Sequence, residues 1–156
     1  MNEVTVRLAR PEELSKVQDL NHELFLSDNR HLADLNTNWP YQEVGKEYFR
    51  QMIAGEIGVC FVAEIEGKLV GYLAGCIQRS DTVYRGKRAE VENMFVDEAQ
   101  RSRGVGSKLI EAFYDWCRQY DVNYVMVTAF TNNDRALSFY QKQGFSDYST
   151  TLWHKL

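Results

Sequence analysis

The chain has 156 residues, the length of one ordinary domain, and its 44% apolar and 26% charged residues are typical of a globular rather than a disordered protein. Its formal net charge of −4 argues against a general nucleic-acid-binding surface, because a phosphate backbone favours a broad basic face. No apolar stretch approaches membrane-spanning length, and the N-terminus lacks a basic start followed by an apolar run, so we expect no membrane span, no signal peptide and a cytoplasmic location.

Periodicity and turn residues divide the chain into helices and strands. The expected strands cover residues 5–9, 59–65, 69–77, 89–96 and 122–130, with one or two closing strands within 145–156. The expected helices run from Pro11 to about Phe25, from about Gln42 to Ala54, from the loop at 100–107 to about Tyr120, and from about Asn132 to Gln143. No linker or repeat interrupts this order, which predicts a single α/β domain with a mixed sheet over residues 1–156.

The cysteines and histidines form no metal-binding pattern. Cys60, Cys76 and Cys117 lie among apolar neighbours and make no CxxC pair, so we expect buried, reduced thiols. His22 lies in HELFL, which lacks the second histidine of a zinc-protease helix. We therefore expect no metal site.

The stretch QRSRGVGSKL, residues 100–109, connects a strand to a helix. At such a junction, free backbone N–H groups and the positive end of the helix dipole can bind an anion. Gly104 and Gly106 have no Cβ, so a phosphate can approach the backbone closely, and Ser107 offers a further amide in the first helical turn. The stretch predicts a phosphate-binding loop.

Basic side chains strengthen this prediction. Arg101, Arg103 and Lys108 make the loop locally basic, and the arginines can add charge-assisted hydrogen bonds. Neither common nucleotide signature fits, however. A P-loop requires lysine directly after the second glycine, where Ser107 stands, and a dinucleotide fingerprint requires glycine where Leu109 stands.

Two motifs together resemble a known family. Residues 101–106 match R-x-x-G-x-G, and residues 133–145 match N-x-x-A-x-x-[FL]-Y-x-K-x-G-F at full spacing. With the order of strands and helices, they are similar to the GCN5-related N-acetyltransferases (GNAT) over essentially the whole chain. Many members carry proline where Glu98 stands and glycine where Ser102 stands, but neither change removes an amide donor.

The resemblance implies a fold and an activity. The fold is the acyl-CoA N-acyltransferase fold, in which two central parallel strands splay apart. The activity is direct transfer of the acetyl group of acetyl-CoA to an amine, without a covalent enzyme intermediate and without a metal. The residues that it implies at the acetyl-CoA site are Met94, Phe95, Val96, Arg101, Arg103, Gly104, Val105, Gly106, Ser107, Asn133 and Tyr140.

The resemblance also implies individual roles. Tyr140 lies beside the sulfur of CoA and acts as general acid, the plain alternative being that it packs beside Phe139 in the core. The amide of Met94, in a strand that is bulged in relatives, polarises the thioester carbonyl, and the backbone of Met94 and Val96 pairs with pantetheine. Asn133 hydrogen-bonds the pantetheine arm, although a helix N-terminal cap is the alternative.

The general base is one of two glutamates. Alternation along the strand AEVENMFV places Glu90 and Glu92 on one face. Glu90 matches the catalytic glutamate of histone-acetylating relatives, and Glu92 matches that of polyamine-acetylating relatives. We favour Glu92, with Glu90, a water chain, or a role limited to attracting a cationic substrate as the alternatives.

The acceptor is expected to be cationic. In the fold that the chain resembles, the acceptor lies against the first two helices and the loop between them, a segment that here contains Asp28, Asp34, Glu43, Trp39 and Tyr41, and the chain is acidic overall. This predicts a polyamine-like or other small amine, or an amino group of a peptide. The alternatives to an enzyme are an acyl-CoA-binding sensor or scaffold of the same fold, and a phosphate-binding or nucleotide-hydrolysing domain. A homodimer is suggested by family habit alone.

Overall fold

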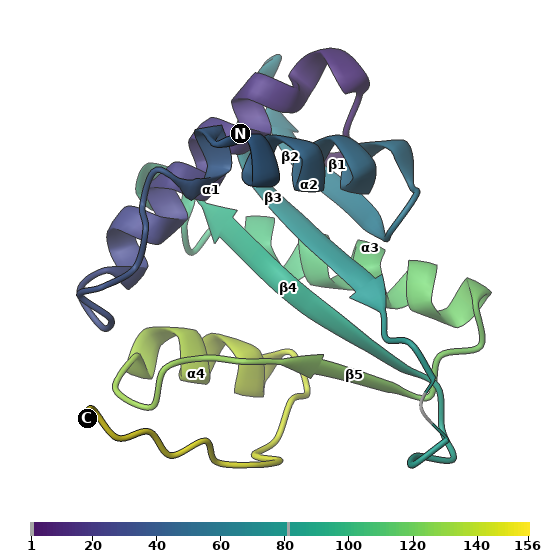
Figure 1. Ribbon diagram of the computed structural model, residues 1–156. Helices are drawn as coiled ribbons and strands as arrows, with labels where there is room; N and C mark the ends of the chain where they lie inside the picture. The colour runs from purple at the N-terminus through teal and green to yellow at the C-terminus, as the bar shows by residue number, and fades with distance from the viewer. Residues whose placement is uncertain (1, 81) are drawn as a thin grey trace.

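The computed structural model describes residues 2–80 and 82–156 and contains one five-stranded sheet in the order β1-β2-β3-β4-β5 (Figure 1). The strands are β1 Thr5–Leu8, β2 Val59–Ile65, β3 Lys68–Ile77, β4 Arg88–Val96 and β5 Tyr124–Val127. Neighbouring strands from β1 to β4 are antiparallel, whereas β5 runs parallel to β4. The mixed α/β architecture expected from the sequence is confirmed.

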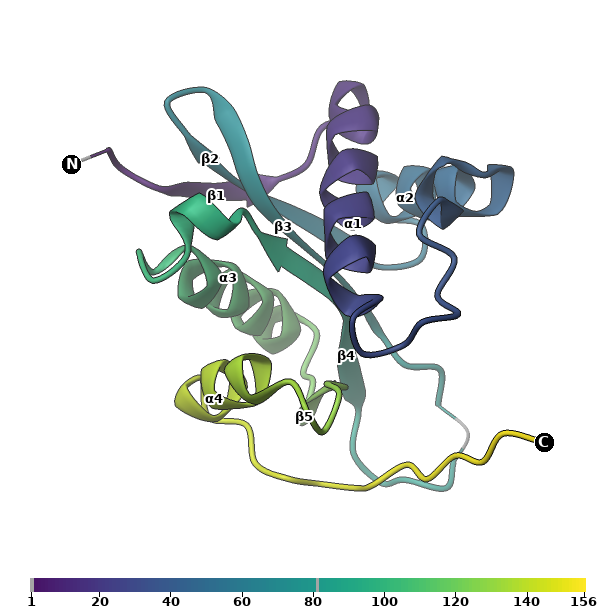
Figure 2. The same ribbon diagram turned by 90° about the vertical axis from the view of Figure 1, so that its left-hand side faces the viewer.

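Helices cover both faces of the sheet. They are α1 Leu14–Asp28, α2 Glu43–Ala54, α3 Val105–Gln119 and α4 Asp134–Lys142, with short 3-10 turns at Pro11–Glu13, Trp39–Tyr41 and Glu98–Gln100. Figure 2 shows α1 and α2 on one side of the sheet and α3 and α4 on the other. Two apolar clusters correspond to these sides, one centred on Phe49 and Tyr72, the other on Leu109, Ile110 and Phe113.

Strand β4 contains one residue more than its antiparallel partner requires. Ala74 of β3 pairs with Asn93, and the next residue, Gly75, pairs with Val91, so Glu92 has no partner of its own. This is a β-bulge, which bends a strand and increases its twist. The bulge expected in this strand is confirmed, and it lies at the glutamate favoured as the base.

The two parallel strands separate just beyond the bulge. β4 pairs with β5 only from Arg88 to Val91, opposite residues 124–127, and from Glu92 onward that edge of β4 has no strand beside it. Figure 1 shows the two arrows diverging from this paired end. The expected splay of the central parallel pair is therefore present.

The prediction for the C-terminal segment was wrong. Residues 145–156 contain no strand, and the expected strand 122–130 is shortened to β5. Apolar side chains of this segment are exposed, including Leu152 and Trp153 at 89% and 79%. Strand-like sequence forms a strand only where a neighbouring edge accepts its hydrogen bonds, and this segment pairs with none in the single chain.

Close packing of α2 generates a stability prediction. A Cβ on Gly45, in the first turns of α2, would lie 2.1 Å from the carbonyl oxygen of Trp39. In a Gly45→Ala variant we expect the free energy of unfolding to fall by about 1–3 kcal/mol, although alanine is normally favoured over glycine in a helix by about 1 kcal/mol. Urea denaturation measures this, with Val44→Ala at a 70% exposed position of the same helix as the control. A stabilised Gly45→Ala variant would contradict the close approach.

Candidate active site

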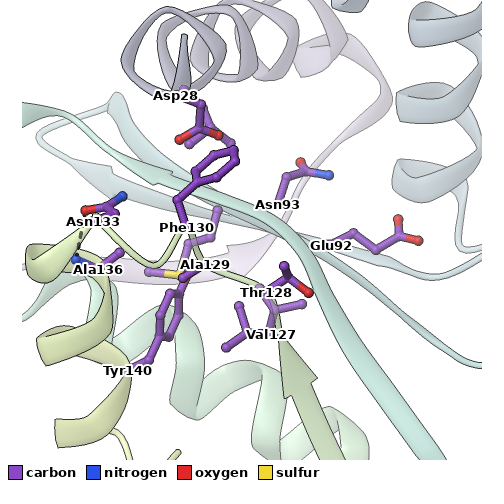
Figure 3. A pocket seen from close by; sticks show the side chains of 13 residues that line it. Asp28, Glu92, Asn93, Val127, Thr128, Ala129, Phe130, Asn133, Ala136 and Tyr140 are labelled. Atoms are coloured by element: carbon purple, nitrogen blue, oxygen red, sulfur yellow. Dashed lines mark hydrogen bonds between the residues drawn. The ribbon is translucent and has the colours of Figure 1, made fainter. Parts of the chain in front are cut away.

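A cavity occupies the opening between β4 and β5, and we call it the inner cavity (Figure 3). Its walls come from the bulge of β4, the segment that follows β5, the end of α1 and the inner side of α4. The lining residues are Leu24, Asp28, Val91, Glu92, Asn93, Met94, Val127, Thr128, Ala129, Phe130, Asn133, Ala136 and Tyr140. The inner cavity thus brings together four of the residues that the sequence analysis proposed for the site: Tyr140, Glu92, Met94 and Asn133.

Tyr140 both packs in the core and lines the inner cavity. Its ring contacts Phe139 and Phe145 edge-on, with centroids 5.2 and 5.6 Å away. Burial, and to a smaller extent the charge of Asp28, raises the pKa of Tyr140 to about 12. The phenol therefore keeps its proton at neutral pH, which suits a proton donor. Packing in the core and a place at the cavity wall are therefore compatible for Tyr140.

Glu92 is held by neighbours that the sequence did not single out. The hydroxyl of Tyr48 on α2 donates a hydrogen bond to one carboxylate oxygen, and the thiol of Cys76 on β3 donates to the other at 3.3 Å. The amide of Asn93 donates to the Tyr48 hydroxyl at 2.9 Å. Burial first, and Glu92 second, raise the pKa of Cys76 to about 12, so the thiol stays protonated and can donate. The polar pair Glu92 and Asn93, in a strand with few polar residues, was the sequence signal for this network.

Glu92 also lines a second, more aromatic hollow. Its walls are Phe25, Leu35, Asn36, Trp39, Tyr48, Glu92 and Asn93, and we call it the aromatic cavity. Glu92 and Asn93 belong to both cavities, so the two adjoin at the bulge. Glu90, by contrast, lines neither and accepts a hydrogen bond from the side chain of Gln78 at 3.0 Å.

The predicted phosphate loop ends in unpaired main-chain amides. Gly104 has φ +79° and precedes the first residue of α3, and the first α-helical hydrogen bond runs from the Lys108 amide to the Gly104 carbonyl. Within the described ranges, no carbonyl or side chain accepts a hydrogen bond from the amides of residues 103–107. These amides and the helix dipole create a positive potential at one point.

The basic side chains around the loop differ in their hydrogen-bond partners. The Nε of Arg101 donates to the Val96 carbonyl at 2.8 Å, which anchors the side chain at the end of β4. The guanidinium of Arg103 donates a hydrogen bond to the Gln100 side chain of the same loop, at 2.6 Å. Lys108 does not contribute as expected, because its Nζ donates to the carbonyl of Val4 at 3.0 Å.

The remaining loop positions have structural roles of their own. A Cβ on Gly106 would lie 2.9 Å from the ring of Phe139 and 3.1 Å from the Met94 methyl, so close packing requires glycine there. Val105 is buried beneath the first turn of α3. The Ser107 hydroxyl accepts a hydrogen bond from Gln143 at 3.0 Å, which links α3 to α4.

Asn133 serves as a helix cap. Its side-chain oxygen accepts a hydrogen bond from the Ala136 amide at 3.2 Å at the start of α4. This is the alternative that the sequence left open, and it leaves the side-chain nitrogen at the wall of the inner cavity. Phe95 and Val96 are buried and lie outside this wall, whereas Met94 is part of it.

The acidic and aromatic residues expected near the acceptor separate into two groups. Asp28 lines the inner cavity and Trp39 the aromatic cavity. Asp34 and Glu43 are exposed and line neither. Tyr41 is 47% exposed and donates its hydroxyl to Asp19 at 2.8 Å.

Comparison with known proteins identifies the family of the chain. The model of the acetyltransferase (GNAT) family matches residues 22–145. The chain belongs to the GNAT family. A spermine/spermidine N(1)-acetyltransferase of Bacillus subtilis is 29% identical over 82 residues, covering 51% of this chain and 54% of the relative. An L-2,4-diaminobutyric acid acetyltransferase of Halalkalibacterium halodurans is 30% identical over 113 residues, 70% of this chain and 53% of the relative.

A solved structure shows the same GNAT fold. The aminoglycoside N-acetyltransferase AAC(6')-Iy, in complex with CoA, superimposes with a TM-score of 0.76 at 18% identity, over 100% of this chain and 96% of that one. The chain spans about half the length of several of the curated relatives it matches. In the part of the chain that the structure describes, no helix is both long and apolar enough to cross a bilayer. Within the same residues, no three His, Cys, Asp or Glu side chains cluster as metal ligands.

Ser102 generates a prediction about the phosphate loop. Its φ of +62° lies in the left-handed region, which disfavours residues with a Cβ by about 1–2 kcal/mol. Because glycine loses more backbone entropy on folding, we expect Ser102→Gly to raise the free energy of unfolding by a net ~0.5–1 kcal/mol. Urea denaturation tests this against Ser15→Gly in α1, which should lower stability. Equal destabilisation by both changes would contradict the strained conformation.

Proposed function

We propose that this protein is an acetyl-CoA-dependent N-acetyltransferase whose acceptor is a primary amine of a cationic small molecule or of a peptide. The observation that carries the proposal is the inner cavity, whose walls contain a proton-bearing tyrosine and two carboxylates, together with the unpaired amides at the start of α3. Membership in the GNAT family supports it.

Acetyl-CoA has a consistent path across these features. Its diphosphate accepts hydrogen bonds from the amides of residues 103–107, with Arg103 adding charge and Arg101 closing the loop against β4. Its pantetheine arm follows the unpaired edge of β4 at Met94–Val96 as an added strand, with Asn133 on the opposite wall. The thioester then lies in the inner cavity.

The cavity walls supply the groups that the transfer needs. The acceptor ammonium must first lose a proton, and the free amine then attacks the thioester carbonyl carbon. The amide of Met94 donates to the developing oxyanion, and Tyr140 donates its proton to the departing sulfur. Of the two glutamates predicted as the base, Glu92 reaches the cavity and Glu90 does not, so Glu90 has no direct role.

The acceptor side favours a cation. Glu92 and the rings of Trp39 and Tyr48 line the aromatic cavity, a combination that binds ammonium groups through charge and cation–π contacts. Relatives named for spermine, spermidine and diaminobutyric acid act on amines that carry a second charged group. We therefore place a distal cation of the acceptor in the aromatic cavity.

Tyr140→Phe separates the enzyme from an acyl-CoA sensor. The variant keeps the ring packing but cannot protonate the sulfur, so we expect kcat to fall on the order of 100-fold while the Kd for CoA stays unchanged. Steady-state kinetics and calorimetry measure the two quantities. Tyr120→Phe, at a 49% exposed position directly after α3, is the control and should keep full activity. An unchanged kcat, or wild-type protein that binds CoA without acetylating any amine in a mixed panel, would favour the sensor.

We also propose that the protein is cytoplasmic and forms a homodimer. Reduced thiols fit the cytoplasm, and Cys60, Cys76 and Cys117 are all free. β5 is an edge strand with one unpaired side, and the neighbouring C-terminal segment exposes Leu152, Trp153 and Leu156. Open edges and exposed apolar chains are typical of surfaces that pair with another copy.

Substituting two tail residues tests the dimer. In light scattering coupled to gel filtration, we expect wild-type protein at about twice 18.2 kDa and the Leu152→Asp/Trp153→Asp variant near one chain mass, because charges there cannot be buried. Wild-type protein that elutes as a monomer at high concentration would contradict the proposal.

A further inference from the structure

Asp28 is a half-buried carboxylate that accepts no hydrogen bond from the described residues. It ends α1 and lines the inner cavity, and Figure 3 shows its carboxylate on the α1 side, above Phe130. Across residues 2–80 and 82–156, no N–H or O–H group donates to its side chain. Burial raises the pKa of Asp28, and His31 lowers it to a smaller extent.

A carboxylate without a hydrogen-bond donor at such a place lowers the stability of the folded protein unless a ligand binds it. Removing an ionised carboxylate from water without a partner is unfavourable, and buried polar groups in folded proteins nearly always have one. Asp28 also lies at the C-terminal end of a helix, where the dipole disfavours negative charge. A cation that enters the inner cavity would compensate for the loss of water, supply the missing hydrogen-bond donor and offset the unfavourable helix dipole.

Glu92, unlike Asp28, already has hydrogen-bond donors. Both of its oxygens already accept hydrogen bonds, from Tyr48 and Cys76. In Figure 3 its carboxylate points away from Tyr140, whereas Asp28 faces the space between α1 and the segment after β5. Of the two acids of the inner cavity, only Asp28 accepts no hydrogen bond from the residues that the structure describes.

We propose that Asp28 binds the reacting ammonium group of the acceptor and removes its proton. The inference rests on the proposed acetyltransferase activity and assigns the base to a residue outside β4. It leaves Glu92 to hold the distal cation at the mouth of the aromatic cavity.

The proton balance of the transfer is complete with these groups. Asp28 takes one proton from R–NH3⁺, and the nitrogen lone pair forms the new N–C bond at the acetyl carbonyl. The C–S bond breaks with its electrons on sulfur, which takes a proton from Tyr140. Tyr140 recovers the second nitrogen proton, and Asp28 releases the first to solvent, so that an amide, a thiol and one proton result.

The test compares Asp28→Asn with Asp34→Asn, an exposed acid of the following loop. With alkylammonium acceptors, we expect Asp28→Asn to lower kcat/KM on the order of 100-fold, with the KM for acetyl-CoA unchanged. With a weakly basic aromatic amine, which is already neutral at the assay pH, we expect little loss. Asp34→Asn should behave as wild type with both acceptors. Equal losses with both acceptors would indicate a structural role and overturn the proposal, as would no loss with either.

Amine binding provides a second readout that needs no turnover. Calorimetric titration of an alkyl diamine into the CoA complex should show a Kd at least about tenfold weaker for Asp28→Asn than for wild type, and no change for Asp34→Asn. Unchanged affinity would overturn the proposal. Wild-type protein that binds the diamine through Asp28 but transfers no acetyl group would contradict the acetyltransferase activity alone.

Discussion

The extra residue in β4 is the constraint on which the site depends. Because Glu92 has no partner on β3, β4 bends at that point and leaves β5 after four paired positions. A regular strand would have continued the sheet and filled the inner cavity with main-chain hydrogen bonds. The bulge instead leaves one edge of β4 without a strand, and it places the carboxylate of Glu92 at the junction of two cavities.

The two ends of the site carry opposite electrostatic potentials. At the start of α3, unpaired amides create a positive end suited to a diphosphate. At the other end, Asp28 and Glu92 supply negative charge for an amine. Tyr140 also lines the inner cavity, and burial and the charge of Asp28 raise its pKa to about 12. The site therefore suits a co-substrate whose diphosphate end is anionic and whose other end reacts with a cationic acceptor.

The sequence predicted those features that depend on local pattern. The helices expected from helical spacing and the glycine-spaced loop at residues 101–106 follow from rules of neighbouring residues, and they agree with the structure. It failed for the C-terminal segment, because strand formation depends on a partner edge and not on the strand residues alone. It also failed for Lys108, whose amine binds the Val4 carbonyl from the far end of the chain.

The roles of residues within the cavity were harder to predict, because they depend on contacts between residues that are distant in the sequence. Asp28 was one acid among several in its segment, and only packing separates it from exposed Asp34. Tyr48 contacts Glu92 from 44 residues away, so no local motif connects them. The GNAT resemblance directed attention to β4 and α4, whereas the unpartnered carboxylate comes from α1.

The central claim is that the amides of residues 103–107 and the opening between β4 and β5 bind one molecule of CoA. A crystal structure of the protein with CoA tests it most directly. The account predicts the diphosphate within hydrogen-bond distance of those amides, pantetheine along the edge of β4, and the sulfur beside Tyr140. A diphosphate bound elsewhere, or an inner cavity left empty by the bound cofactor, would contradict the account.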